Sequence, residues 1–322
     1  MKVYVFSYNR GEFLDNCLGS IDRCLPEHEV HVIDDNSQDL LTCEVLERWS
    51  DRFRIHRTAD SDGDYKVGGL NQNMQWALDD AVDAKTEFAL FIQDDMQMLR
   101  PLERQDRQAI QEFFRVNESA TQYVPCFMKL ANARDETERT VIDPSNNAYI
   151  RQPGHSRQRA FIDVGVFHAH RFQELFGPLQ GGEGSNNEEA ERRGLIMGLA
   201  IRPFMMWLPM PISHRGKSRG PILKAQERLA GAGFHPYTQL DQSATRALFT
   251  THNSLRPFAE KWLTCEGVKG KRQWSFVGGR SSLEEQGGWR RAIARLMKVQ
   301  KDLNRAIQRR LDRTLATRSD TR

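Results

Sequence analysis

A chain of 322 residues is long enough to bury a substantial hydrophobic core, either as one large domain or as one domain with an appendage. Its composition, 39% hydrophobic and 28% charged, is ordinary for a globular protein and excludes a disordered or fibrous one. The net charge of +3 is unevenly distributed, because residues 289–318 hold ten basic and two acidic side chains and contribute +8, which leaves −5 for the rest. The basic character therefore belongs to the last part of the chain.

No secretory or membrane-spanning segment is predicted. Residues 1–6 run straight into a β-like segment without the charged and apolar regions of a signal peptide. The longest apolar run, residues 204–211, is far shorter than the roughly 20 residues that span a bilayer. The five cysteines are odd in number and scattered, which favours reduced thiols over a disulfide framework. We therefore expect a cytoplasmic protein.

The first hundred residues alternate between strand and helix patterns. Short β-rich runs occupy residues 2–7, 29–33, 53–57 and 88–92. Between them, Leu14, Leu18 and Ile21 recur at helical spacing, as do the apolar residues of 70–82. The last run is apolar throughout, which is typical of a strand buried on both faces. The alternation predicts an α/β fold with a largely parallel, Rossmann-like sheet between layers of helices.

Polar or acidic loops follow three of these strands. They are Ser7–Arg10, Asp34–Asp39 and Gln93–Met96. Ligands of such sheets bind beyond the carboxyl ends of the strands, so we expect the three loops to meet at one edge.

Asp94 and Asp95 are the most informative pair in these loops. Two neighbouring carboxylates at the end of a buried strand oppose each other's ionisation, and a divalent cation resolves that conflict. Mg²⁺ and Mn²⁺ prefer oxygen ligands and commonly sit between carboxylates and substrate phosphates. The alternative is structural, with one aspartate capping the following turn and the other solvated.

The second half of the chain is less regular. We predict a helix over 101–117, strands over 123–130 and 161–167, an exposed excursion over 131–158, a helix over 188–197 and a strand over 200–208. We also predict a lid over residues 213–245 and a basic amphipathic helix over residues 289–318. The expected domain is 1–245, divided into a nucleotide-binding half (1–101) and an acceptor-side half (102–245), followed by an extension over 246–322.

At this point the chain resembles the family-2 glycosyltransferases. The matching segments are Val5–Asn9, Val32–Ser37, Gly69–Ala77 and Phe91–Asp95, in order and at similar spacing. The resemblance implies a GT-A type nucleotide-diphospho-sugar transferase fold with a C-terminal helical extension. It also implies that Asp35 accepts a hydrogen bond from the nucleotide base, and that Phe6 and Ser7 line the base pocket.

Asn9 and Asn71 belong to the same donor-side motifs. By the resemblance, Asp94 and Asp95 hold the metal, Mn²⁺ or Mg²⁺, and the ribose of the donor. The family often has Asp-x-Asp here, whereas this chain has two adjacent aspartates, so the motif does not decide which one touches the metal.

The acceptor side of the family supplies further candidates. Glu188, with Glu189 next, resembles the acidic residue that deprotonates the acceptor hydroxyl, and the alternative is a favourable helix-dipole arrangement of acidic residues at a helix start. His214 resembles a late histidine that completes the metal site in some GT-A enzymes, and the alternative is a surface histidine.

Two other nucleotide-binding motifs are excluded. Gly216-Lys217-Ser218 lacks the earlier glycine of a P-loop, since residue 211 is Pro, and no Gly-x-Gly-x-x-Gly follows the first strand. The basic helix fits three roles: packing on the catalytic domain, binding a partner, or lying on anionic lipid at the inner face of the membrane. Nucleic acid is disfavoured because no aromatic-rich surface accompanies the charge.

The sequence thus predicts a metal-dependent, inverting glycosyltransferase. The donor is a nucleotide sugar, with a UDP-sugar favoured. The acceptor is a hydroxyl of a glycan, a lipid-linked molecule or another compound, in synthesis of cell-envelope or surface polysaccharide. The alternative is an inactive GT-A scaffold that binds a partner or a membrane through its basic helix.

Overall fold

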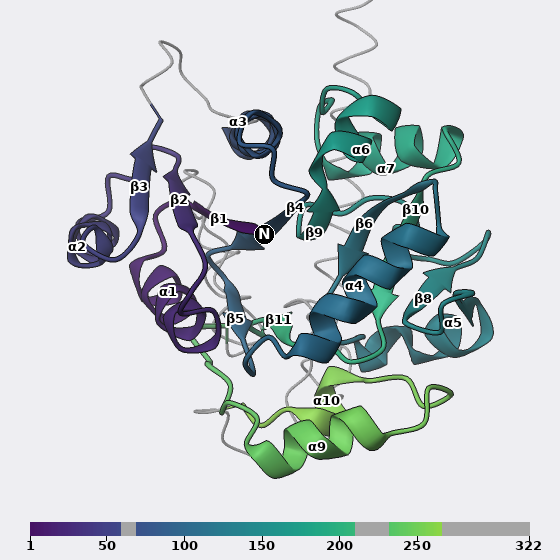
Figure 1. Ribbon diagram of the computed structural model, residues 1–322. Helices are drawn as coiled ribbons and strands as arrows, with labels where there is room; N and C mark the ends of the chain where they lie inside the picture. The colour runs from purple at the N-terminus through teal and green to yellow at the C-terminus, as the bar shows by residue number, and fades with distance from the viewer. Residues whose placement is uncertain (59–68, 210–231, 266–322) are drawn as a thin grey trace, which may run out of the picture. The chain divides into compact units, whose positions relative to one another are not determined.

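The computed structural model of the chain describes residues 1–58, 69–209 and 232–265 (Figure 1). Of these, residues 1–58, 69–208 and 234–265 belong to one compact unit. The predicted basic helix, His214 and residues 213–231 of the predicted lid lie outside the described residues. The fold below is that of the described unit alone.

Four parallel strands form the first half of a nine-stranded sheet. They are β1 (Lys2–Ser7), β2 (Val30–Asp34), β3 (Arg54–Arg57) and β4 (Phe88–Gln93), in the order β3-β2-β1-β4. In the register of the sheet, Ser7 is opposite Asp34, and Phe6 is opposite Gln93. The carboxyl ends of β1, β2 and β4 therefore lie side by side.

Helices cover both faces of this half. Helices α1 (Gly11–Cys24) and α2 (Leu40–Trp49) pack together on one face, and α3 (Gly69–Asp83) lies on the other (Figure 1). Helix α1 buries Leu14, Leu18 and Ile21 as its spacing predicts. Helix α2 begins after Asp39, whose carboxylate accepts a hydrogen bond from the Thr42 N–H at 2.9 Å and so satisfies a free donor of the first turn.

The second half continues the sheet in the order β4-β9-β6-β10-β8-β7. Its elements in the sheet are β6 (Ala120–Val124), β7 (Thr140–Ile142), β8 (Ala148–Arg151), β9 (Gly165–His168) and β10 (Ile196–Ala200). A separate two-stranded sheet pairs β5 (Met96–Met98) with β11 (Met205–Trp207). Its helices are α4 (Arg104–Val116), the 3-10 turn η1 (Leu130–Asn132), α5 (Ala133–Glu138), α6 (Ala169–Leu175), α7 (Glu183–Arg192), α9 (Gln242–Thr250) and α10 (Ala259–Trp262).

Strands β8 and β9 run against the other strands of the large sheet, since each is antiparallel to both of its neighbours. The arrangement confirms the predicted α/β class and its largely parallel sheet between helices. The prediction of an exposed excursion over 131–158 is wrong, because β7 and β8 within it extend the sheet. The predicted helix over 188–197 also begins too late, because α7 starts at Glu183 and β10 takes its last residues.

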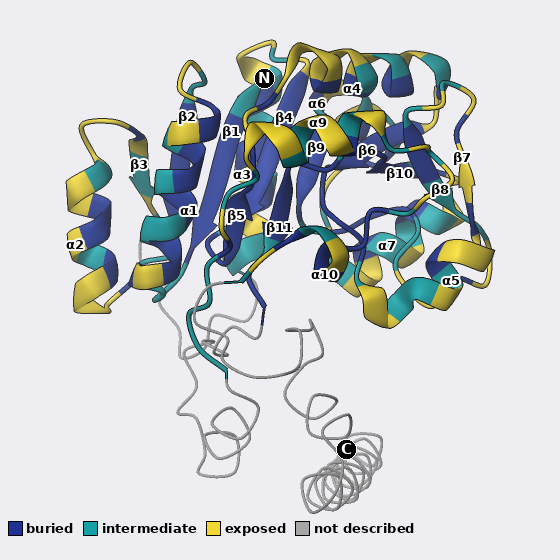
Figure 2. Ribbon diagram, turned by 90° about the horizontal axis from the view of Figure 1, so that it is seen from below, coloured by how far each residue is buried: buried dark blue, intermediate teal, exposed yellow. Residues whose placement is uncertain are grey.

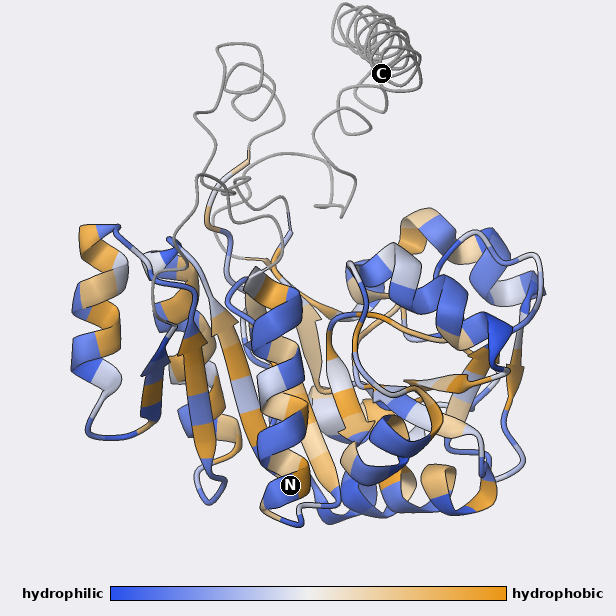
Figure 3. Ribbon diagram, turned by 90° about the horizontal axis from the view of Figure 1, so that it is seen from above, coloured by the Kyte–Doolittle hydropathy of each residue, from blue (hydrophilic) through white to orange (hydrophobic). Residues whose placement is uncertain are grey.

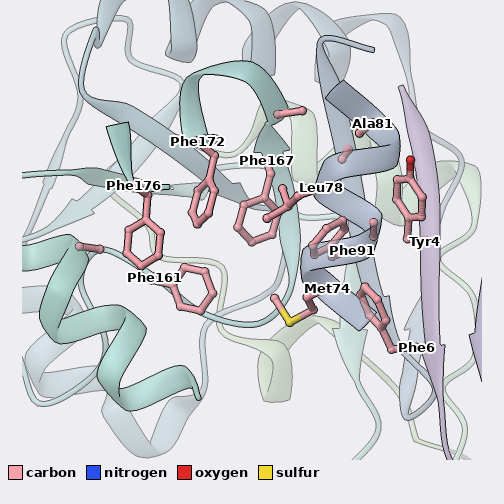
Figure 4. Packing of buried hydrophobic residues seen from close by; sticks show 14 of the residues in the cluster. Tyr4, Phe6, Met74, Leu78, Ala81, Phe91, Phe161, Phe167, Phe172 and Phe176 are labelled. Carbon is pink, nitrogen blue, oxygen red and sulfur yellow. The ribbon is translucent and has the colours of Figure 1, made fainter. Parts of the chain in front are cut away.

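A cluster of buried aromatic rings lies between the sheet and helices α3, α6 and α7 (Figure 4). Phe91 of β4 lies 4.7 Å from Phe167 of β9 between ring centroids, and Phe172 of α6 packs edge-on against Phe167 at 5.3 Å. Each such ring contributes roughly 1.5–3 kcal/mol on burial. The hydropathy colours show the same division, with apolar strands inside and polar residues on the outer helix faces (Figure 3). One core thus supports both halves of the sheet.

The described part of the C-terminal segment is packed on this unit. Both oxygen and nitrogen of the Gln97 side chain bond the backbone of Tyr237, at 3.0 and 2.8 Å. The Tyr237 hydroxyl donates to the Trp207 carbonyl at 3.0 Å, and the Leu208 N–H donates to the Asp95 carbonyl at 2.7 Å. Residues 234–245, predicted as lid, are therefore held to the sheet unit at Tyr237.

The predicted domain boundary at residue 245 falls inside α9. Residues beyond it pack on the same unit: the Met128 N–H donates to the Pro257 carbonyl at 3.0 Å, and Ala259 N–H donates back to Met128 at 2.8 Å. Burial colours show the central strands of the sheet buried, while the edge strand β7 and the outer faces of α2, α5 and α9 are exposed (Figure 2). These contacts show that the unit continues past residue 245.

Candidate active site

The loops after β1 and β2 are bonded to each other. Asn9, in the left-handed region with φ of 49°, donates its N–H to the Ser37 hydroxyl at 2.8 Å, and its side-chain oxygen accepts from the N–H groups of Gln38 and Asp39 at 2.9 and 3.0 Å. Buried Asp34 accepts hydrogen bonds from the Ser37 N–H and hydroxyl. In this structure Asn9 positions the second loop, and its predicted donor contact stays a prediction.

Asp35 lies beside the first residue of α3. A methyl group added at Gly69 would lie 2.1 Å from Oδ2 of Asp35, so only glycine allows this approach. The Thr58 hydroxyl donates to Oδ1 of Asp35 at 3.3 Å, and the Asp35 N–H donates to the Ser7 carbonyl at 2.9 Å. A carboxylate at a helix N-terminus is favoured by the helix dipole. Asp35 is thereby held at the edge where the strands end.

Phe6 and Ser7 point to opposite faces of β1. The Phe6 ring lies in the core, edge-on to Phe91 at 5.1 Å, and offers a ligand almost no surface (Figure 4). The Ser7 hydroxyl is buried and has no hydrogen-bond partner within the described part of the chain.

Asn71 lies in the first turn of α3, where its side-chain oxygen accepts a hydrogen bond from Asn186 of α7 at 3.2 Å. It therefore links α3 to the helix that carries Glu188 and Glu189, the predicted acceptor-side glutamates.

Arg10 joins the two aspartates that follow β4. One guanidinium nitrogen lies 2.7 Å from Oδ2 of Asp95 and 3.3 Å from Oδ1 of Asp94. The Tyr8 N–H donates to the other oxygen of Asp94 at 3.0 Å. Burial raises the pKa of Asp94 above its ordinary range, and the positive charge of Arg10 opposes that rise. The chain thus provides its own cation for a buried acidic pair.

Asp95 retains one oxygen that suits a divalent metal. Its Oδ1 is buried and has no hydrogen-bond partner among the described residues. In residues 1–58, 69–209 and 232–265, no group of three or more His, Cys, Asp or Glu side chains could hold a metal by itself. A metal here would need substrate oxygens, as is common for Mg²⁺ bound through one or two carboxylates and phosphates. His214 lies outside the described residues.

A cavity of about 280 Å³ opens next to the acidic pair, at the carboxyl ends of β6 and β10. Gln93, the last residue of β4, lines it and precedes Asp94 directly. The charged side chains of its wall are Lys129, Arg151, Arg157, Asp163 and Glu183. The cavity therefore adjoins the edge formed by β1, β2 and β4.

Asp163 and Glu183 are two carboxyl groups of unusual acidity in this cavity. Burial, and then the charge of Glu183, raise the pKa of Asp163 to about 7. Burial also raises the pKa of Glu183 above its ordinary value, while Arg157 and Lys129 oppose that rise. Oδ1 of Asp163 is buried without a hydrogen-bond partner in the described residues. A carboxyl group with a pKa near neutral pH is well suited to general-base work.

The predicted bases lie away from this cavity wall. Glu188 is exposed on α7. Glu189 is bound by Arg192 and Arg193, with contacts of 2.6 Å, and these hydrogen bonds lower its pKa to about 2. A carboxylate paired in this way is a poor proton acceptor.

The sequence interpretation missed Asp163 and Glu183. A lone aspartate inside the apolar run of 161–167 was one available signal. The other was the glycine directly before Glu183. In the structure this residue, Gly182, has φ of 118° and precedes α7, so it marks the true helix start.

Neither a protein-family model nor a curated protein sequence matches the chain. Among solved structures, the chain is similar to S. aureus TarS 1-349, at 14% identity and a TM-score of 0.43, over 64% of this chain and 60% of that one. For the complex of the same protein with UDP-GlcNAc, the identity is 13% and the TM-score 0.44, over 77% of this chain and 70% of that one. For the mannosyltransferase PcManGT from Pyrobaculum calidifontis, in complex with GDP-Man and Mn²⁺, the identity is 16% and the TM-score 0.41, over 71% of this chain and 60% of that one.

At these identities and TM-scores, the site residues take their proposed roles from their own geometry. The match spans about 60% of the first of these structures. Within the described residues, every helix is too short or too polar to cross a bilayer.

Proposed function

We propose that the protein is a GT-A type glycosyltransferase that moves a sugar from a nucleotide-sugar donor to a hydroxyl acceptor. The observation that carries the proposal is the position of Gln93. It ends β4, precedes the Asp94–Asp95 pair, and lines the cavity that contains Asp163 and Glu183. An edge suited to a charged donor therefore adjoins a cavity with two candidate bases, which is what sugar transfer to a hydroxyl requires.

On the donor side, Asp35 binds the base or ribose, and Asp94 and Asp95 lie where the diphosphate enters. Asp95 is the better ligand for Mn²⁺ or Mg²⁺, because its Oδ1 has no hydrogen-bond partner in the part of the chain that the structure describes, and Asp94 lies beside it. When bound, such a metal offsets the negative charge on the departing diphosphate. Arg10 keeps the pair neutralised before the donor arrives. A UDP-sugar is the favoured donor.

On the acceptor side, Asp163 or Glu183 takes the proton of the attacking hydroxyl. Direct attack by one activated hydroxyl inverts the anomeric centre. Asp163 fits the base role better, because its Oδ1 has no hydrogen-bond donor among the described residues and its pKa of about 7 is matched to neutral pH. Glu188 and Glu189 are the less suited alternatives, given their exposure and ion pairs.

The test combines binding and turnover. A panel of nucleotide sugars with Mn²⁺ is screened for thermal stabilisation, since a ligand of the folded state raises its stability. Donor hydrolysis and transfer are then measured with Mn²⁺ present and after chelation. We expect chelation and Asp95→Asn to reduce turnover at least a hundredfold. Nucleotide binding without turnover on a broad acceptor panel would instead favour the inactive scaffold.

Membrane contact and a role in envelope or surface polysaccharide rest on the basic pattern of 289–318. Vesicles with and without anionic lipid provide the test. Binding of the full chain to anionic vesicles only, lost in a chain that ends at residue 288, supports a peripheral location at the inner face of the membrane. Equal binding by both chains contradicts it.

A further inference from the structure

The segment that carries Asp163 takes its shape from two amide side chains. Residues 159–164 lead into β9 and contain neither helix nor strand. Backbone groups that are removed from water need hydrogen-bond partners, and a segment outside the regular elements must find them elsewhere. Gln122 of β6 and Asn187 of α7 provide these partners.

Gln122 holds the backbone on both sides of Asp163. This side chain is fully buried. Its amide nitrogen donates to the carbonyls of Ile162 and Val164 at 2.6 and 2.8 Å. Its amide oxygen accepts from the Ile162 N–H at 3.0 Å. The residues directly before and after Asp163 are therefore both fixed to β6.

Asn187 holds the residues that come before. Its side-chain oxygen accepts from three successive N–H groups, those of Arg159, Ala160 and Phe161, at 3.0, 3.1 and 3.3 Å. Its amide nitrogen donates to the carboxylate of Glu191, one turn further along α7, at 2.8 Å. This last contact keeps the oxygen turned towards the segment, which is thereby bonded to α7.

These contacts also set the position of Asp163 relative to Glu183. Glu183 is the first residue of α7, and Asn187 follows four residues later on the same side of the helix. Both carboxyl groups line the cavity, and the charge of Glu183 contributes to the raised pKa of Asp163. The other charged side chains of the cavity wall are Lys129, Arg151 and Arg157. The segment is thus attached to α7 one turn away from the neighbouring carboxyl group.

The two amides bond the backbone around Asp163, and their hydrogen bonds do not reach its carboxyl group. Oδ1 of Asp163 is buried without a hydrogen-bond partner among the described residues. Hydrogen bonds to a carboxylate favour its charged form and lower its pKa. Holding the backbone in this way therefore leaves a carboxyl group that can take up a proton near neutral pH.

We propose that Gln122 and Asn187 are positioning residues, which hold the bend at Asp163 so that its carboxyl group faces the cavity beside Glu183. Neither amide belongs to the cavity wall, so each acts through Asp163. The inference rests on the proposed glycosyltransferase function, with Asp163 as the base.

The first experiment measures turnover of Asn187→Ala in the full chain, with the donor and acceptor that support transfer best. Three N–H groups lose their acceptor and the bend is released. We expect kcat to fall at least about tenfold with the donor KM unchanged, and the acid limb of kcat/KM to move about one pH unit lower. Asn187→Asp keeps an oxygen for the three N–H groups, so it should not move the limb to lower pH. Wild-type kcat and acid limb in Asn187→Ala would overturn the proposal.

A double-mutant cycle shows whether the amides act through Asp163. Gln122→Met is apolar and of similar length, and we expect it to lower kcat as Asn187→Ala does. In an Asp163→Asn background, either amide variant should change kcat less than about twofold, because residues that act on one group are not additive. Fully additive losses would overturn the proposal. Asn187 is only partly buried, so its variants decide the question even if Gln122→Met does not fold.

Asn117→Ala is the matched control. Asn117 is another buried amide, which donates to the Phe113 carbonyl at 2.9 Å and lies outside the cavity wall. Its loss should lower stability without changing kcat or the acid limb. A shifted limb in Asn117→Ala would show that any loss of stability moves it, and would overturn the proposal.

The second experiment needs no turnover. Denaturant unfolding of wild type and Asn187→Ala is measured at several pH values. A lower pKa of Asp163 reduces the stability that its protonation adds at low pH, so the deficit of the variant should be larger at about pH 4 than at about pH 8. A pH-independent deficit would mean that Asn187 only stabilises the fold, and would overturn the proposal.

The two experiments separate this inference from the proposed function. A pH-dependent deficit of Asn187→Ala, in a protein that transfers no sugar, supports the positioning of Asp163 and contradicts the transferase. Sugar transfer with unchanged kcat and acid limb in both amide variants supports the transferase and contradicts the positioning role.

Discussion

Arg10 is the residue whose removal best separates electrostatic support from metal binding. Its side chain is 17% exposed and contacts both Asp94 and Asp95. Removing one partner of a buried ion pair typically costs about 3–5 kcal/mol, because the remaining charge is left uncompensated. We expect Arg10→Gln to lose about 3 kcal/mol in the free energy of unfolding without metal, and Mn²⁺ to stabilise this variant more than the wild type.

Urea unfolding with and without Mn²⁺ measures both effects. Arg48→Gln is the control, since Arg48 and Asp15 form an exposed pair worth less than about 1 kcal/mol. An equal Mn²⁺ effect on Arg10→Gln and on the wild type would show that Arg10 and the metal do not share the aspartates.

Asp163 makes stability depend on pH. Its pKa is raised from 3.8 to about 7 in the folded state, so the folded state binds the proton more tightly than the unfolded one. Its contribution is fully present below about pH 4 and is lost as the pH rises through 7. The free energy of unfolding of Asp163→Asn, measured relative to wild type, should rise by as much as about 4 kcal/mol between pH 4 and pH 7. Above pH 7 this difference should stay constant. Denaturant unfolding at several pH values tests this; a pH-independent difference argues against it.

The same carboxyl group predicts a pH profile of activity. A general base must be ionised, so kcat/KM should fall below about pH 7. Glu183→Gln removes a charge that raises the pKa of Asp163, so it should move this acid limb to lower pH. Asp163→Asn should reduce activity at least a hundredfold with little change in donor KM. If Glu183→Gln abolishes activity and Asp163→Asn does not, Glu183 is the base.

At the residue scale, the sequence predicted that the loops after β1, β2 and β4 meet at one edge, and it missed the carboxyl groups of the cavity. Asp94 and Asp95 could be identified from the sequence because they closely follow the apolar run of residues 88–92, which shows where the strand ends. Asp163 could not, because its raised pKa comes from burial by side chains distant in sequence. The pairing of Arg10 with both aspartates also depends on tertiary structure.

At the scale of elements, the start of α3 carries a close contact that one methyl group would break. Gly69→Ala places its Cβ 2.1 Å from the Asp35 carboxylate, so either the helix start or Asp35 must move. We expect a loss of roughly 1–3 kcal/mol in stability and about tenfold weaker nucleotide binding. Calorimetric titration with the best nucleotide measures the binding.

The matched control lies in the first turn of α7. Nothing lies within 4 Å of a Cβ added at Gly184, and alanine is the better helix former by roughly 1 kcal/mol. Gly184→Ala should therefore be neutral or stabilising. A Gly69→Ala variant that is as stable as Gly184→Ala would mean that helix propensity, rather than the Asp35 contact, governs the first position of α3.

Elements with strong periodicity were predicted, and short ones were not. Strands β1, β2 and β4 and helix α3 lie within a few residues of their predicted bounds. Strands β7 and β8 are short, and β7 at the sheet edge leaves Val141 and Ile142 exposed, so no alternation of apolar and polar residues marks them. The pairing of β8 with β10, and of β7 with β8, supplies the order that their sequence does not indicate.

At the scale of the whole described unit, residues 246–265 belong to the same compact unit as the large sheet. The Tyr149 hydroxyl donates to the Asn253 carbonyl at 2.7 Å, and buried Glu260 accepts from the Leu130 N–H at 2.9 Å. A chain that ends at residue 245 exposes these groups and the cavity wall at Met128. We expect it to lose cooperative thermal unfolding, whereas a chain that ends at residue 288 should retain it. Circular dichroism on heating tests both; cooperative unfolding of the shorter chain contradicts the integral role.

Two hydrogen bonds, one between Tyr237 and Trp207 and one between Leu208 and Asp95, affect which changes of sequence the fold tolerates. The Trp207 carbonyl accepts from the Tyr237 hydroxyl, and the Leu208 N–H donates to the Asp95 carbonyl, so Leu208 and Tyr237 are fixed close to each other in the described unit. Since closing a loop of doubled length costs only about 0.6 kcal/mol more, insertions or exchanges there burden folding little. The sheet, the acidic pair and the core can thus stay unchanged when the sequence or length between Leu208 and Tyr237 changes.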